Sequence, residues 1–399
     1  MKKRQSNFFM TISFVFFFTR LLAFNDADST KPAKIICPPK HYFSNTIYMD
    51  MYVTGERKLD TINQITHVVN QVSKKLSSFQ LNQFSAGFNV PVITKDFYNK
   101  DSTKISNIHF LLTGGYTKLN LNFGGISDHQ LSKTSLGFRA IYNNGKKSIF
   151  FVDVAPFVTQ DDGYAYTRTY RLATTLVYNY SASEYFCFRA GFTRSFLWGN
   201  RFNLPYVGIR VGKLDKVNFS IQFPRGASFN FPLGKYARSS FYTKVQGGLY
   251  SFANTDSIQV GNLNDNKKLF FGRNEFLAGW RVDILPSKYF SAYLSTGFTT
   301  QNYISFSSSS TATSNLMAYG NYYRQKIKPS IFLNVGVVVR FGKTKSIYNN
   351  YAMYNAIDLN NTTGDNINMG NGNIPVPEKK IKINNTNQIL DLIETQDLY

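Results

Sequence analysis

Apolar and polar residues alternate with period two from about residue 78 to residue 341, and this pattern restricts the possible folds more than any other feature. In the last segment the apolar face comprises Ile331, Leu333, Val335, Val337, Val339 and Phe341. The opposite face of that segment comprises Phe332, Asn334, Gly336, Val338 and Arg340. Alternation over this length is typical of a β-strand with two different environments on its two faces.

The alternation, interrupted by turn residues, predicts fourteen strands. Their expected ranges are 46–54, 78–92, 105–119, 133–143, 147–158, 165–180, 184–196, 203–213, 216–223, 226–232, 238–252, 268–285, 289–300 and 327–341. Twelve strands are the alternative, because the pattern over 46–54 is weak and residues 217–232 fit a single strand kinked at Pro224.

A soluble β-sandwich also alternates, so the composition of the two faces has to separate it from a membrane barrel. Aromatic residues make up 16% of the chain, and Phe and Leu fill one face along whole strands. The other face is polar or glycine and carries isolated arginines. Aromatic residues also gather at segment ends, as interfacial girdles require: Tyr142, Tyr178, Tyr180, Trp198, Tyr206 and Tyr289. We therefore expect an all-β fold, a transmembrane antiparallel up-and-down β-barrel of 12–14 strands, with fourteen preferred.

Connection lengths support fourteen strands, because bacterial barrels have short periplasmic turns and long outer loops. Short turns at 143–147, 181–183, 214–215 and 286–288 then share the periplasmic side. Longer loops at 55–77, 120–132, 159–164, 253–267 and 301–326 share the outer side. Residues 61–76 also fit a short amphipathic helix in the first outer loop, because their apolar residues recur at helical spacing.

The two termini differ from the strand region. Residues 1–4 are basic and residues 8–19 are apolar, which indicates a signal peptide over 1–23 that is cleaved after Ala23. Cleavage after Ala27 and an uncleaved anchor are the alternatives. A segment over 24–45 leads into the barrel at 46–342, and residues 343–399 form an Asn-rich, low-complexity tail. We expect export to the outer membrane of a diderm bacterium, with a flexible periplasmic tail; a docking peptide is the alternative for the tail.

The charge is strongly positive, +22 for the whole chain. Removal of residues 1–23 deletes four bases and no acid, which leaves 22 − 4 = +18. The bases are scattered singly through aromatic segments instead of clustering in runs, so nucleic acid is not expected as a partner.

If the apolar faces contact lipid, strand parity assigns the charged residues of the barrel to the lumen. The expected lumen charges are Arg139, Asp153, Arg171, Arg189, Arg210, Lys244, Arg273, Glu275, Arg281, Asp283 and Arg340. Eight bases against three acids give 8 − 3 = +5. Two interpretations fit: an interior network of ion pairs such as Arg273–Glu275 and Arg281–Asp283, or a pore that attracts anions.

Catalysis, metal binding and cofactor binding are not expected. The four histidines are His41, His67, His109 and His129, and only His109 falls within a predicted strand. No serine or acid pattern marks a partner for His109, as a nucleophile and its base would require. Cys and His show no metal-ligand spacing, and no glycine-rich phosphate loop is present.

Five short stretches resemble an uncharacterised outer-membrane β-barrel family of diderm bacteria, a domain-of-unknown-function family. They are Phe88–Val92, Val154–Pro156 with Asp161–Asp162, Leu204–Val207, Phe223–Pro224 and Asn334–Phe341. The resemblance covers about residues 78–341 and implies a fold and a location, but no activity. The last strand also resembles the signal read by the barrel-assembly machinery, although 399 − 341 = 58 residues follow it.

The sequence thus predicts an outer-membrane barrel, either structural or a small passive channel with a basic lumen. The alternative is a surface binding protein, an adhesin or receptor that uses its long outer loops. The expected partners are outer-membrane lipid and, during biogenesis, the barrel-assembly machinery, and we expect a monomer.

Overall fold

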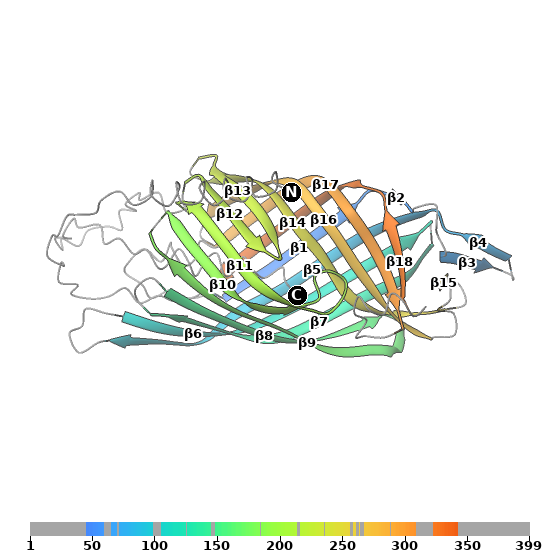
Figure 1. The fold of residues 1–399 in the computed structure, drawn as a ribbon, viewed down its shortest axis with the longest axis horizontal. Helices are drawn as coiled ribbons and strands as arrows, with labels where there is room; N and C mark the ends of the chain where they lie inside the picture. The colour runs from blue at the N-terminus through green and yellow to red at the C-terminus, as the bar shows by residue number, and fades with distance from the viewer. Residues whose placement is uncertain are drawn as a thin grey trace, which may run out of the picture. The chain divides into compact units, whose positions relative to one another are not determined.

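The structure is a computed structural model and describes residues 45–341, apart from gaps at 60–64, 70–71, 99–104, 125, 145–147, 184, 214–215, 235, 256–257, 261–262, 264–266, 288 and 309–321. The predicted signal peptide over 1–23 and the predicted tail over 343–399 lie outside the described residues. Within the described ranges every regular element is a β-strand (Figure 1). None of these residues forms a helix long and apolar enough to cross a membrane.

Fourteen antiparallel strands close into a barrel, as the alternation predicts. They are β1 (Asn45–Thr54), β5 (Ser78–Tyr98), β6 (Ile105–Phe123), β7 (Ile126–Asn143), β8 (Ser148–Asp161), β9 (Tyr164–Ser181), β10 (Phe186–Ser195), β11 (Phe202–Gly212), β12 (Asn218–Phe223), β13 (Gly226–Pro232), β14 (Ala237–Ala253), β16 (Lys268–Ser287), β17 (Phe290–Ser307) and β19 (Ser330–Phe341). Consecutive strands pair, and β1 pairs with both β19 and β5, so no gap is left in the ring.

The alternative of twelve strands is wrong. The segment over 46–54 is a full barrel strand that closes the ring. The segment over 217–232 is two strands, because β12 and β13 pair with each other through Phe219 opposite Phe229 and turn at residues 224–225. Proline at the turn suits this hairpin, because it has no N–H to donate to a ladder.

The two ends of the barrel differ in their connections. We call the end where β1 begins and β19 ends the near end, and the opposite end the far end; Asn45 pairs with Phe341 at the near end. The expected short turns between β7 and β8, β9 and β10, β11 and β12, and β16 and β17 all lie at the near end. The expected long loops at 55–77 and 253–267 both lie at the far end.

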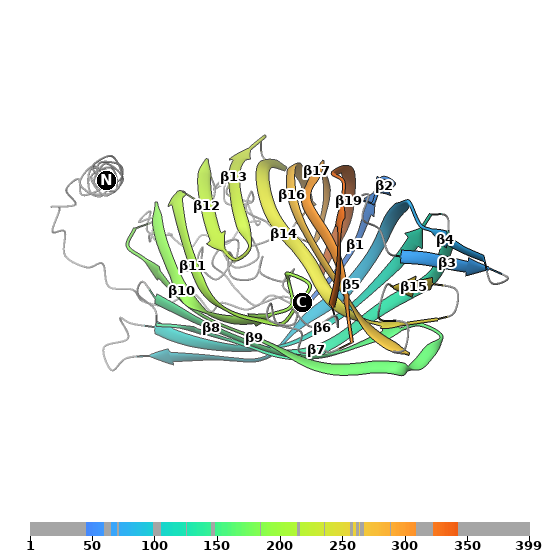
Figure 2. The ribbon, with the colours of Figure 1, turned by 45° about the vertical axis from the view of Figure 1, so that its right-hand side comes forward.

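Three predictions for the far end are wrong. Residues 65–69 and 72–75 are not helical: β3 (Ile65–Val69) pairs with β4 (Val72–Lys75) and with β15 (Ile258–Val260), so two loops distant in sequence form a small separate sheet (Figures 1 and 2). The loops expected at 120–132 and 159–164 are tight turns, because the flanking strands continue to within two residues of each other. The loop expected at 301–326 is also shorter, since β17 reaches Ser307 and β18 (Tyr322–Ile327) pairs with it.

Strand length is uneven around the ring, and this shapes the far end. The strands β10–β13 have 6 to 11 residues, whereas β5, β6, β7 and β9 have 18 to 21. The ladder between β9 and β10 therefore stops at Thr174, and the ladder between β13 and β14 stops at Lys244. Beyond these points the far-end halves of β9 and β14 lack strand partners on their facing edges among the described residues.

The short strands β10–β13 leave a step in the barrel wall between β9 and β14. At this step the far-end half of β14 packs against the inner surface of β8 and β9. Ser251 Oγ lies 2.9 Å from Thr169 Oγ1 and 3.0 Å from Thr159 Oγ1. The backbone N–H of Ala253 donates to Asp161 Oδ2 at 2.9 Å. From residue 248 to residue 253, β14 is consequently buried on both faces. Period-two alternation gives every strand one lipid-facing side and so does not predict this.

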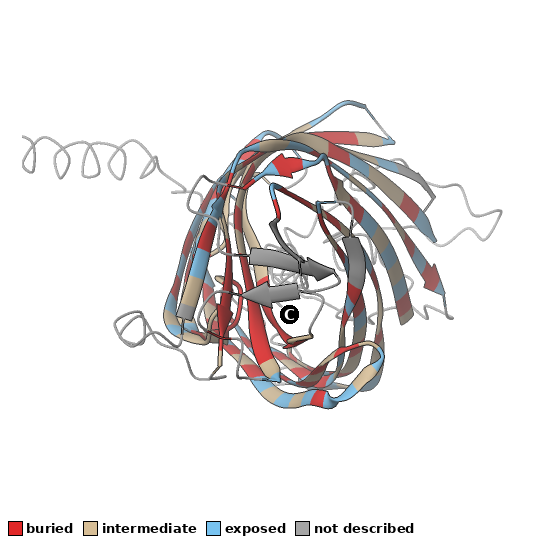
Figure 3. Cartoon of the chain, turned by 90° about the vertical axis from the view of Figure 1, so that its right-hand side faces the viewer, coloured by how far each residue is buried: buried red, intermediate tan, exposed pale blue. Residues whose placement is uncertain are grey.

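Elsewhere buried and exposed residues alternate along the strands (Figure 3). On β19 the exposed face comprises Ile331, Leu333, Val335, Val339 and Phe341. Of the predicted girdle residues, Tyr142, Tyr180 and Tyr289 are exposed. Tyr206, however, is buried and donates its hydroxyl to Gln222, because it belongs to the inner face of β11.

The register predicts that residues 344–399 are dispensable for barrel formation. All ten β1–β19 pairs are complete at Phe341, so no barrel strand depends on the residues that follow. We expect the chain truncated after Lys343 to refold in detergent and to retain heat-modifiable gel migration. A truncated chain that migrates at its unfolded position without heating contradicts this expectation.

Candidate functional site

An apolar core closes the far end of the barrel from inside. It joins side chains of eight barrel strands, together with residues of the far-end loops and β18. Leu131 of β7 and Phe252 of β14 belong to it although their strands lie on opposite sides of the ring. The rings of Phe252, Phe271 and Phe306 pack with centroids 5.1–6.5 Å apart, and all three are fully buried. Burial of each ring contributes about 1.5–3 kcal/mol to the stability of the folded state.

A second apolar cluster lies at the step in the wall, on the far-end side of the short strands β10–β13. Phe196 in the β10–β11 turn packs against Phe157 of β8, Ala173 of β9, and Leu249 and Phe270 of β14 and β16. The turn can lie this close because Gly247 has no side chain: a Cβ there would collide with the carbonyl oxygens of Arg273 and Leu197. The two clusters together make the far half of the barrel a packed interior.

A buried ion-pair network lies within the apolar core, because Tyr52 belongs to both and Arg57 lies over the core ring of Phe79. Glu275 of β16 accepts from Arg57 Nη1 at 2.5 Å and from Arg273 Nη2 at 2.5 Å. The hydroxyl of Tyr52 donates to the same carboxylate at 3.0 Å, and Arg273 also donates to Gln83 Oε1 at 2.8 Å. The three charged side chains are at most 1% exposed. The network therefore ties β16 to β1, β2 (Arg57–Lys58) and β5 across the lumen.

Two further predicted lumen pairs are present. Arg139 donates to Asp153 Oδ2 at 2.7 Å, and both side chains are buried. Arg281 donates to Asp283 at 2.6 Å and lies 4.0 Å above the ring of Tyr293, with the guanidinium partly exposed. The pairs Arg273–Glu275 and Arg281–Asp283, which the spacing of two residues predicts, both form.

The other predicted lumen bases are also placed on the inner side. Arg171 donates to Thr159 and to the carbonyl oxygen of Leu249, which holds β9 against β14. Arg340 donates to Ser291 at 3.2 Å and is buried. Arg189 and Arg210 are buried on neighbouring strands, and the stem of Arg189 lies against Gly208. Arg189, Arg210 and Arg340 make the near half of the interior basic, whereas Arg171 lies beside the second apolar cluster.

A small polar cavity of about 100 Å³ lies in the interior below the apolar core. Its lining includes the predicted lumen residues Arg139 and Lys244, and also Lys133, which the sequence analysis places at the start of a strand without a role. Asp50 is the acid in the lining, and Tyr48 and Ser135 supply hydroxyl groups. The cavity thus combines several cations with neutral hydrogen-bonding groups.

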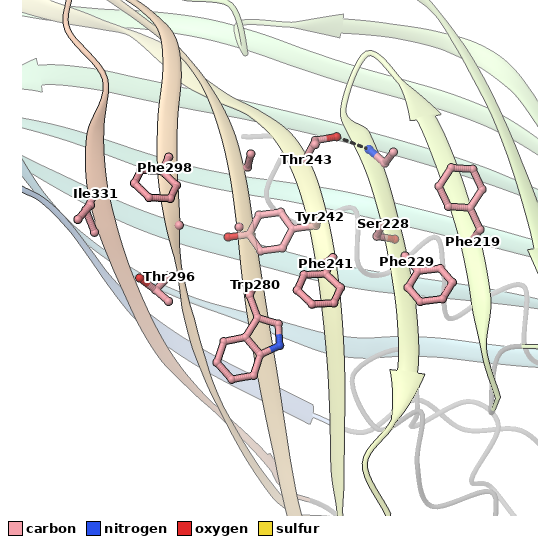
Figure 4. Close-up of a pocket in the computed structure, with 14 residues that line it drawn as sticks. Phe219, Ser228, Phe229, Phe241, Tyr242, Thr243, Trp280, Thr296, Phe298 and Ile331 are labelled. Atoms are coloured by element: carbon pink, nitrogen blue, oxygen red, sulfur yellow. Dashed lines mark hydrogen bonds between the residues drawn. The ribbon is translucent and has the colours of Figure 1, made fainter.

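A larger hollow of about 690 Å³ lies on the opposite, exposed side of the wall. Its floor has the small residues Ala227, Thr243 and Ala278 on successive strands (Figure 4). One rim is a row of aromatic rings that are opposite one another in register: Phe219, Phe229, Phe241 and Trp280. This apolar groove belongs to the surface that a membrane would cover.

Two histidines, His129 at the far end and His109 near the near end, have structural contacts. His129 Nδ1 lies 2.6 Å from Asp161 Oδ2, and its ring stacks on Phe252 with centroids 4.0 Å apart. His109 Nδ1 lies 3.1 Å from Thr94 Oγ1. In the part of the chain that the structure describes, no three His, Cys, Asp or Glu side chains gather closely enough to hold a metal ion.

Three of these residues are not predicted from the sequence, and the reasons are identifiable. Arg57 lies in a predicted loop, and no signal in the sequence places it opposite Glu275. His129 and Asp161 lie in segments taken as loops, although both continue the inward parity of their strands. Extending the alternation of β7 and β8 by a few residues would have brought this pair together.

The comparisons with known proteins give structural similarity only. No protein-family model matches the chain, and no curated protein matches it, so the relation to the uncharacterised barrel family stays a resemblance. The transport unit of the autotransporter AIDA-I from Escherichia coli is similar over 81% of this chain and 94% of its own, with 10% identity and a TM-score of 0.35. The β domain of the Bordetella autotransporter BrkA covers 75% of this chain and 100% of its own, with 10% identity and a TM-score of 0.30. An outer membrane channel from Pseudomonas putida F1 covers 78% and 100%, with 12% identity and a TM-score of 0.28.

Proposed function

We propose that this chain is an outer-membrane barrel that acts as a small passive channel with a basic lumen, closed at its far end in the conformation described above. The near end, with its short turns, faces the periplasm in this proposal. The observation that carries it is the division of the interior into a polar, positively charged near half and an apolar far half.

The exterior supports a membrane location. The exposed apolar face of β19 runs from Ile331 to Phe341, and at the usual rise and tilt of a barrel strand these ten steps span about 25 Å. That height equals the apolar band of outer-membrane barrels. A closed ring also leaves no unpaired strand edge in lipid.

The interior supports a channel over a purely structural barrel. Buried charges add little stability to a barrel with a dry, packed interior. Apolar residues of similar volume fill the same space and give equal or greater stability. Here a buried arginine that lines the polar interior, Arg139, keeps an unsatisfied donor at Nη1. Such donors are stabilised by water or by anions, and both belong in a conducting lumen.

Conductance tests the proposal. We expect the full-length protein in a planar bilayer to open rarely, and the double variant Phe252→Ala, Phe306→Ala to conduct with anion preference, because two rings of the apolar core are removed. Anion preference should increase at low ionic strength, where screening is weaker.

The matched control is Phe298→Ala, which removes an exposed ring from the outer face and should leave conductance unchanged. If the double variant folds, as heat-modifiable migration reports, and remains silent, the barrel is structural. Conduction with cation preference would refute the basic lumen.

The binding-protein alternative has one specific observation in its favour. The far-end loops are organised: β3, β4 and β15 come from two loops and pair as one sheet. Ordered loops on a rigid scaffold are a common basis for recognition. Conductance separates the two candidates, because a surface binding protein requires no ion flow.

A further inference from the structure

The inner face of the wall is strongly basic close to the near end of the barrel. Six arginines lie there, each within six residues of the near-end limit of its strand: Arg139, Arg189, Arg210, Arg238, Arg281 and Arg340. Among the strand residues whose side chains the structure describes, the same part of the inner face carries three acids: Asp50, Asp153 and Asp283. We call this part of the interior the near-end mouth, and its net charge is 6 − 3 = +3.

The arginines surround the near-end mouth instead of meeting at one point. Arg189 and Arg210 are diagonal neighbours, because Arg210 is opposite Cys187 and Arg189 is opposite Gly208. Arg340 lies on β19, six strand pairings away around the ring. Fourteen strands that are about 4.8 Å apart and tilted by about 45° enclose a ring about 30 Å across. Charges spread over this width suit a ligand whose acidic groups are spread along a peptide.

An apolar patch lies on the inner face of the same mouth. Ile141, Phe151 and Val177 are opposite one another in register on β7, β8 and β9, and Ile149 is the next inward residue of β8. All four side chains are at most 1% exposed. They belong to neither of the two apolar clusters described above. The near-end mouth therefore offers apolar contacts as well as positive charge.

The sequence after the barrel contains a segment of complementary chemistry. Residues 388–399 (QILDLIETQDLY) contain three acids and no base. They also contain five aliphatic residues: Ile389, Leu390, Leu392, Ile393 and Leu398. The last barrel strand ends at Phe341, at the near end, and 388 − 341 = 47 residues lead from there to the start of the segment. A coil of that length has a root-mean-square span of about 35–40 Å, which exceeds the width of the mouth.

We propose that residues 388–399 bind inside the near-end mouth of their own barrel, with Asp391, Glu394 and Asp397 on the arginines and the aliphatic side chains on the apolar patch. The three acids offset the net charge of +3, and contact with the patch removes apolar surface from water. The connection to β19 holds the segment at an effective concentration in the millimolar range, so modest contacts are enough. The inference rests on the basic interior of the proposed function, but it does not require conduction.

Double electron–electron resonance on the refolded full chain tests this contact. In a background of Cys37→Ser and Cys187→Ser, spin labels are attached at Thr395→Cys in the segment and at Lys216→Cys in the exposed near-end turn before β12. We expect a narrow distance distribution centred below about 30 Å, the width of the ring. The triple variant Asp391→Asn, Glu394→Gln, Asp397→Asn leaves the barrel wall unchanged and should convert it into a broad distribution.

The matched control removes the same charge from another part of the tail. Asp358→Asn, Asp365→Asn, Glu378→Gln neutralises the other three acids after Phe341, and the narrow distribution should remain. The double variant Arg189→Gln, Arg210→Gln tests the contact from the side of the wall and should broaden the distribution.

A broad distribution in the chain with all its acids overturns the proposal, and so does a narrow distribution that survives the first triple variant. A narrow distribution between labels on two different copies, position 395 on one and position 216 on the other, would assign the segment to a neighbouring chain and also overturns it. Failure here is distinguishable from failure of the channel. If Phe252→Ala, Phe306→Ala conducts anions while the distribution is broad, the docking proposal fails and the channel stands. If the distribution is narrow and that variant is silent, the segment docks in a structural barrel.

Discussion

Replacement of Glu275 by Gln should destabilise the barrel by about 3–5 kcal/mol, the usual effect of removing one partner from a buried ion pair. Arg57 and Arg273 both donate to this carboxylate, so the variant leaves two buried guanidinium groups without their counter-charge. The measurement is the free energy of unfolding in urea, followed by tryptophan fluorescence in a reversible detergent or lipid system.

The matched control for Glu275 is Asp283→Asn. Asp283 also pairs with an arginine two residues away on β16, but that arginine is 36% exposed. Water can solvate Arg281 when its partner is lost, so this variant should change the free energy of unfolding by less than about 1 kcal/mol. Equal losses in the two variants would mean that the interior around Glu275 is wet in solution.

The substitution Val335→Arg should lower the free energy of unfolding by about 2–4 kcal/mol, because Val335 lies near the middle of the exposed apolar face. Its register partners on the two neighbouring strands are Met51 and Leu294, and both are exposed and apolar. A charge at this position has no partner on the outer face and must stay in hydrocarbon. The free energy of unfolding in lipid vesicles measures the cost.

Phe341→Arg is the depth control, because Phe341 lies on the same face of the same strand at the near end. A charge at the membrane interface costs about 0–1 kcal/mol, so this variant should be only weakly destabilised. If both arginine variants lose the same stability, or if neither loses any, the face formed by β19 does not contact lipid.

Period-two alternation was sufficient to predict the wall of the barrel. It needs only local information: each strand has one face toward the interior and one toward the outside, and hairpins join neighbours. The pairs Arg273–Glu275 and Arg281–Asp283 follow from it, and the lengths of the connections then favour fourteen strands over twelve and place the short turns at one end.

The closure of the far end could not be predicted in the same way, because it depends on strands that are distant in sequence. Leu249 and Phe252 have opposite parity on β14, so alternation assigns one of them to lipid. In the structure both are buried, since the strand passes between the apolar core on one side and β8 and β9 on the other. The helix expected at 61–76 fails for a related reason: β3 pairs with β15, almost two hundred residues away.

The short strands β10–β13 have a consequence for self-association. They expose the edge of β14 beyond Lys244, and a free strand edge is a template for aggregation with a second chain. Here Val245 N–H donates to the carbonyl of Arg225 at 2.7 Å, Leu249 O accepts from Arg171, and Ala253 N–H donates to Asp161. Side chains and a turn of the same molecule thus take the place of the missing strand at these three positions of β14, and they leave less of this edge open to a neighbouring copy.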